Sequence, residues 1–129
     1  MSRAWWLGCG IGFVSVATGA FGAHALKGMV GADALAWWDT GSRIAALHAA
    51  PCLFAATLSA RGSRAAGFAA AGFGLGVLLF SGSLWAMALT GLRALGMITP
   101  LGGVSLLGAW VALAVAGARL GAPPHTQSA

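Results

Sequence analysis

Two of the three histidines are the most reactive candidates in this chain. His24 follows the apolar segment 5–23, and His48 lies inside a second apolar segment. An ionisable side chain in such surroundings is a functional candidate, because imidazole can carry protons near neutral pH and can bind metals. Each histidine also has a structural interpretation. His24 lies at an interface, where a histidine needs no special account. His48 could hydrogen-bond Ser81 or a backbone carbonyl loosened near Pro51.

Three hydroxyl side chains complete the candidate set, which then comprises His24, His48, Ser81, Ser83 and Thr99. A serine beside a histidine could act as a nucleophile on a lipid. No Ser–His–acid set is available, however, because both acids lie together in one loop. We therefore expect a protein that is not an enzyme.

Metal and cofactor binding have little support. His48 and Cys52 are spaced four apart and His24 could join them, but two or three ligands fall short of a closed tetrahedral set. The sequence has no phosphate-binding loop and no dinucleotide fingerprint. We expect no metal and no cofactor.

The composition is typical of a membrane protein. Of 129 residues, 59% are hydrophobic and only 7% are charged, whereas a soluble domain carries about a quarter charged residues. This balance excludes an ordinary cytosolic enzyme and a disordered chain. The net charge is +5, but the basic residues stand singly at the edges of apolar blocks. A nucleic-acid site needs them clustered, so the expected partner is the lipid bilayer.

The elements that must position the candidates are four apolar segments, each near the length of about 20 residues that a bilayer requires. They predict an all-α integral membrane bundle of four transmembrane helices, over approximately 5–23, 44–60, 65–89 and 99–118. We expect residues 1–120 to form one domain and residues 121–129 to form a disordered C-terminal tail.

The segment between the first two spans holds both acids and two tryptophans. Asp33 could cap a short helix over 34–42, and tryptophan prefers the headgroup level. Asp39 and Arg43 are spaced for an i,i+4 ion pair. We expect a short interfacial helix here, and a gating or substrate-facing element is the alternative.

Four alternating spans predict that the candidate residues converge on one side. His24 ends the first span and His48 lies about one turn into the second. Ser81 and Ser83 lie about 24 to 27 Å along the third, and Thr99 begins the fourth. Such a His24/His48/Ser81/Ser83 cluster would suit a small transporter or proton-handling module.

The basic residues also indicate orientation. The side that holds both termini carries four of them and the opposite side three, and the short turn with Arg61 and Arg64 weighs most. Both termini are therefore expected in the cytoplasm.

Glycine accounts for 21 residues. Small residues let helices approach closely in lipid. Pairs such as Gly8/Gly12 and Gly72/Gly76 have Gly-x-x-x-Gly spacing, and they suit packing within the chain or contact between copies.

Three blocks in order resemble the signature of domain-of-unknown-function family 423, a family of small bacterial inner-membrane proteins. They are Gly19-Ala-Phe-Gly-Ala-His-Ala-Leu26, Leu79-Phe-Ser-Gly-Ser-Leu-Trp85 and Ile98-Thr-Pro-Leu-Gly-Gly-Val104 with the later Trp110. His48 matches a family histidine, and the resemblance covers roughly residues 5–120. Relatives usually carry a Tyr/Gln-rich stretch where this chain has 41–47.

The resemblance implies a four-span protein in the plasma membrane, here the bacterial inner membrane, and implies no established reaction. Helix packing is the expected role of the matched glycines Gly19, Gly22, Gly82, Gly102 and Gly103. The favoured function is an accessory or scaffold subunit, with a second copy or another membrane protein as partner. A small transporter and a lipid-acting enzyme are the alternatives.

Overall fold

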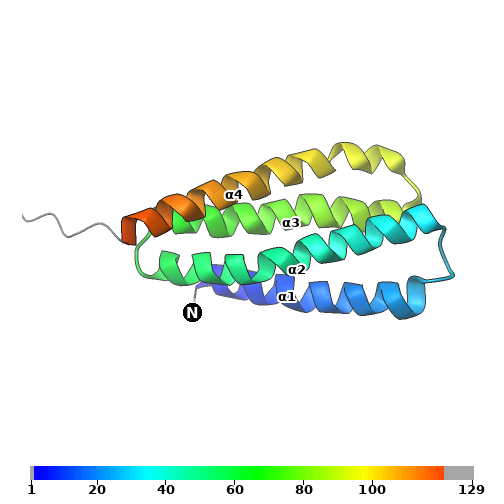
Figure 1. Ribbon diagram of the computed structural model, residues 1–129, viewed down its shortest axis with the longest axis horizontal. Coiled ribbons are helices and arrows are strands. Elements are labelled where there is room, and N and C mark those ends of the chain that lie inside the picture. The colour runs from blue at the N-terminus through cyan, green and yellow to red at the C-terminus, as the bar shows by residue number, and fades with distance from the viewer. Residues whose placement is uncertain (1, 121–129) are drawn as a thin grey trace, which may run out of the picture.

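Four long helices dominate the computed structural model, which describes residues 2–120 (Figure 1). They are α1 (Arg3–Phe21), α2 (Ala32–Ala60), α3 (Arg64–Thr90) and α4 (Thr99–Leu120). A π-helical turn, η1 (Gly22–Leu26), continues α1, and a 3-10 turn, η2 (Arg93–Met97), precedes α4. All four are long and apolar enough to cross a membrane, which confirms the all-α class and the four predicted spans. The predicted tail, 121–129, lies outside the described residues.

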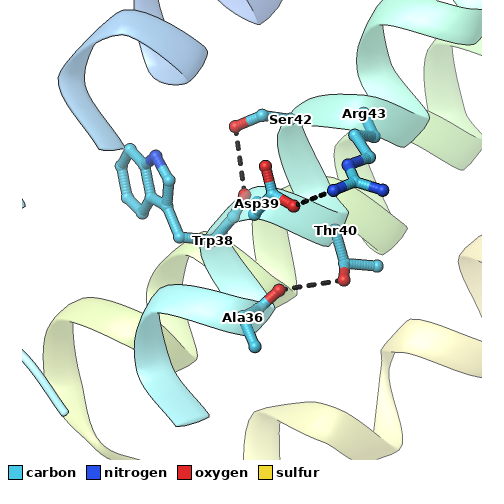
Figure 2. A network of polar contacts seen from close by, with 6 residues as sticks. All are labelled: Ala36, Trp38, Asp39, Thr40, Ser42 and Arg43. Carbon is cyan, nitrogen blue, oxygen red and sulfur yellow. Dashed lines mark hydrogen bonds and ion pairs between the residues drawn. The ribbon is translucent and has the colours of Figure 1, made fainter. Parts of the chain in front are cut away.

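The separate interfacial helix predicted over 34–42 is wrong, because this segment is the first part of α2. The helix begins after Gly31 and continues without a break through 29 residues. Gly41 lies within this helix and does not interrupt it. The glycine is packed against α3, because a Cβ there would lie only 2.9 Å from Trp85 Nε1. The predicted Asp39–Arg43 ion pair is confirmed at 2.7 Å on the exposed face of α2 (Figure 2).

The helices lie side by side in chain order (Figure 1). Within the described chain, α2 packs against α1 and α3, α3 packs against α4, and α1 has few contacts with α3. The outer helices α1 and α4 therefore keep large apolar side chains exposed, such as Phe13 and Val111. A face of this kind is stable in hydrocarbon and unstable in water.

Small residues fill the core between α2, α3 and α4. Ala45, Cys52 and Ala69 are completely buried around Phe73. The Gly-x-x-x-Gly pairs pack within the chain: Gly8 and Gly12 face Leu53 and Ala49 of α2, and Gly72 and Gly76 face Ala109 and Leu106 of α4. These glycines let neighbouring helices approach closely, as packing in lipid requires.

Candidate functional site

The five candidate side chains do not meet in one cluster. His24 lies on η1 and is exposed, whereas His48, Ser81 and Ser83 are buried. Among these five, the one hydrogen bond joins Ser83 to Thr99. The structure therefore separates a histidine at the loop end of α1 from a histidine inside the helical layer.

His48 lies near the middle of α2, because the helix begins at Ala32. Its Nδ1 lies 2.7 Å from the carbonyl oxygen of Ile44. Its Nε2 accepts a hydrogen bond of 3.2 Å from Trp110 Nε1 of α4. A carbonyl can only accept and an indole N–H can only donate, so the ring proton belongs on Nδ1.

The His48 ring is also enclosed by aromatic side chains. Phe73 of α3 lies 5.7 Å from it and Trp110 lies 6.1 Å from it, measured between ring centroids. Phe73 and Trp110 stack edge to face at 5.4 Å. Three helices thus contribute to one polar and aromatic contact, in which both imidazole nitrogens already have partners.

The His48–Trp110 bond can be tested with a double-mutant cycle. We expect the His48→Phe and Trp110→Phe changes to be coupled by about 0.6 kcal/mol, the average that double-mutant cycles give for hydrogen bonds between membrane helices. The free energy of unfolding in detergent of the four proteins measures this coupling. Strictly additive effects would contradict a direct bond between the two side chains.

Ser83 and Thr99 join α3 to the first residue of α4. Their hydroxyl oxygens are 2.7 Å apart, and Ser83 Oγ also lies 2.9 Å from the carbonyl oxygen of Phe80. Ser81 is completely buried, and its hydroxyl has no hydrogen-bond partner within residues 2–120. It follows Phe73 by eight residues, about 12 Å along α3, so Ser81 and His48 lie at different depths.

The five signature glycines differ in how much space a side chain would have at each position. At Gly22 and Gly102 a Cβ would overlap neighbouring atoms, of Trp38 and of the Phe80 backbone respectively. At Gly103 a Cβ would make ordinary contact with the Phe80 ring at 3.8 Å. At Gly19 and Gly82 a Cβ would meet no atom within 4 Å. Close helix approach therefore requires glycine at Gly22 and Gly102.

A tryptophan network that the sequence did not indicate joins α1, α2 and α3. Trp38 Nε1 donates to the carbonyl oxygen of Thr18 at 2.7 Å, and Trp85 Nε1 donates to Ser42 Oγ at 3.3 Å. Ser42 Oγ lies 3.0 Å from both Thr18 Oγ1 and the Trp38 carbonyl, and its single proton serves one of them at a time. Figure 2 shows the contact of Ser42 with the Trp38 carbonyl. In the sequence, only the i,i+4 spacing of Trp38 and Ser42 could have indicated that these two side chains share one face of a helix.

A pocket of about 420 Å³ lies beside this network, between the end of α1 with η1 and the first turns of α2. We call it the α1/α2 pocket. Its lining includes Gly19, Gly22, Lys27, Trp38, Asp39 and Ser42. Charged side chains and a concave surface coincide here, and His48 is not part of the lining.

Within the described residues, no group of three histidine, cysteine or acidic side chains stands close enough to hold a metal ion. Three of the buried polar side chains there, Ser42, His48 and Ser83, form hydrogen bonds with another helix, whereas Ser15 bonds within α1 and Ser81 has no partner.

A family model described as a protein of unknown function (DUF423) matches residues 18–103. The chain belongs to the DUF423 family. Members of this family that resemble the chain include the UPF0382 inner membrane protein YgdD of Escherichia coli (strain K12), which is 41% identical over 110 residues and covers 84% of each chain. The chain is thus a multi-pass protein of a family of small inner membrane proteins.

Two further DUF423-type relatives are similar over most of their length. The UPF0382 membrane protein of Haemophilus influenzae is 40% identical over 103 residues, or 80% of this chain and 83% of the relative. YwdK of Bacillus subtilis (strain 168) is 37% identical over 108 residues, or 82% of this chain and 88% of the relative. No solved structure matches the chain.

Proposed function

We propose that this protein is a non-enzymatic accessory or scaffold subunit of the bacterial inner membrane. The observation that carries the proposal is the use of its buried polar groups. His48 bonds Trp110, Ser42 bonds Trp85, and Ser83 bonds Thr99, each across two helices. A side chain engaged in such a bond would have to break it before acting on a substrate, so these contacts support a structural role.

The partner surface that we propose is the outer face of α1. In the 18-residue apolar stretch of this span, only 22% is buried within the chain. This share is smaller than in any other span of the described residues. Phe13 and Val16 are 75% and 73% exposed. Large apolar side chains of this kind can pack against a second copy or another membrane protein as well as against lipid.

We also propose that both termini face the cytoplasm. The two ends of the described chain lie at the same end of the helical layer (Figure 1). The turn between α2 and α3, with Arg61 and Arg64, belongs to that end too. A short basic loop is retained in the cytoplasm during insertion, which favours this orientation.

Site-specific photocrosslinking in native membranes tests the scaffold role. A photoreactive residue in place of Phe13 is expected to give one adduct of defined mass with a protein, because this face has few contacts within the chain. The same residue in place of Val111, which is exposed on α4, serves as the matched control and is expected to give lipid adducts. Lipid adducts alone at residue 13 would contradict the proposal.

The proton-handling and lipid-acting alternatives depend on the same residues. A proton relay through His48 needs Nε2 to release Trp110, and a nucleophilic serine needs a base beside it. Ser83 has Thr99 beside it, and Ser81 is displaced from His48 along the helix. These contacts favour the structural role over both alternatives.

A further inference from the structure

The α1/α2 pocket lies at the depth of lipid headgroups. The residues of α2 between Arg43 and Arg61 carry no charge, and the 18 steps between the two arginines span about 27 Å at about 1.5 Å each. This length is close to the hydrocarbon thickness of about 30 Å. Asp39 lies one turn beyond Arg43, or about 6 Å further, inside the headgroup layer of about 5 to 8 Å.

Two residues of opposite charge line the pocket. Lys27 lines it from the end of η1, and Asp39 lines it from α2. Within residues 2–120 Lys27 forms no ion pair, so its ammonium group is available to an anion. Asp39 is paired with Arg43, but a carboxylate can accept several further hydrogen bonds. The two charges therefore match a ligand that carries both a phosphate and a cation.

The backbone holds Lys27 at the edge of this pocket. The π-helical turn η1 leads directly into it, and π-helical turns are frequently found at functional sites. The chain then turns sharply at Gly28, which has φ +93°, and Met29 N donates to the carbonyl oxygen of Leu26 at 2.9 Å. The position of the lysine thus follows from a defined local structure.

We propose that the α1/α2 pocket binds the headgroup of a phospholipid that carries a primary ammonium group, as phosphatidylethanolamine does. The phosphate lies against Lys27 and the ammonium group against Asp39. A primary ammonium donates three hydrogen bonds and satisfies a carboxylate directly, whereas the trimethylammonium group of choline donates none. The pocket therefore distinguishes the two headgroups through Asp39.

Native mass spectrometry of the full chain in detergent tests this site. The protein is offered equal amounts of phosphatidylethanolamine, phosphatidylcholine and phosphatidylglycerol. We expect phosphatidylethanolamine to be retained about tenfold better than phosphatidylcholine, the effect of one hydrogen bond to a charged group. Equal retention of these two lipids would overturn the proposal.

Two conservative variants separate the roles of the charges. Asp39→Asn is expected to weaken the preference for phosphatidylethanolamine over phosphatidylcholine, because a neutral amide oxygen accepts a weaker hydrogen bond from the ammonium group than a carboxylate does. Lys27→Gln is expected to lower the retention of all three phospholipids by about tenfold, because each contains the phosphate. An undiminished preference in Asp39→Asn would overturn the assignment of the ammonium group to Asp39.

Gly19→Leu blocks the pocket without changing its charges. Gly19 lines the pocket, yet a Cβ there meets no atom within 4 Å, so the helices need not move. Gly108→Leu is the matched control, because Gly108 also faces open space and lies on α4 away from the pocket. We expect lipid retention to be lost in the first variant and unchanged in the second, and equal retention in both would refute the site.

A soluble headgroup distinguishes a lipid from a small metabolite. Glycerophosphoethanolamine carries the same phosphate and ammonium but no acyl chains. We expect it to leave bound phosphatidylethanolamine in place at millimolar concentration. Complete displacement would show that the pocket takes a soluble phosphoethanolamine, and the lipid assignment would fail.

Discussion

Gly102→Ala is expected to destabilise the protein by about 3 kcal/mol, the upper range for overpacking a filled interior. The added Cβ would overlap the backbone nitrogen of Phe80 and lie 2.8 Å from its Cα. Backbone atoms of α3 cannot turn away as a side chain can, so α3 and α4 must separate. The free energy of unfolding, followed by circular dichroism during titration of the detergent-solubilised protein with sodium dodecyl sulfate, measures the loss.

The neighbouring glycine gives the matched control. A Cβ at Gly103 would make ordinary contacts of 3.8 and 3.9 Å with the Phe80 ring. Gly103→Ala is therefore expected to change stability by less than about 0.5 kcal/mol, as a substitution without a clash does. Equal losses in the two variants would contradict an effect of the close approach of α3 and α4 at Gly102, because Gly→Ala raises helix propensity at both positions.

The number and order of the spans could be predicted because they depend only on the length of apolar segments between charged turns. The Arg61-Gly-Ser-Arg64 turn lies between α2 and α3 as expected, and Gly62 there adopts φ +93°. The start of α2 could not be predicted in the same way. Asp33, Asp39 and Arg43 suggested a separate surface helix, but charges are tolerated where a long helix leaves the hydrocarbon.

The candidate site was harder to predict because hydrophobicity does not distinguish the faces of a membrane helix. In water a buried face is apolar and an outer face is polar, but in lipid both are apolar. Phe13 on the outer face of α1 and Phe73 in the core look alike in the sequence. The partner of His48, Trp110, is 62 residues away and depends on the rotation of α4.

Gly22→Leu is expected to destabilise the protein by about 3 kcal/mol or more, because it would separate the α1 end from α2. A Cβ at Gly22 would lie 2.6 Å from Cδ1 and 2.8 Å from Nε1 of Trp38. Trp38 cannot rotate away cheaply, since its Nε1 donates to Thr18 and its ring packs 5.4 Å from that of Phe21 and 6.0 Å from that of Trp85. Thermal unfolding in detergent measures the loss.

Gly19→Leu tests whether this effect is specific to the contact with Trp38. Gly19 lies one turn earlier on the same helix and faces open space, so the same added side chain is expected to leave the unfolding temperature unchanged. A loss as large as that of Gly22→Leu would show that a bulky residue anywhere near this end of α1 is harmful. A difference between the two would locate the requirement for glycine at the single position where η1 meets the tryptophan network.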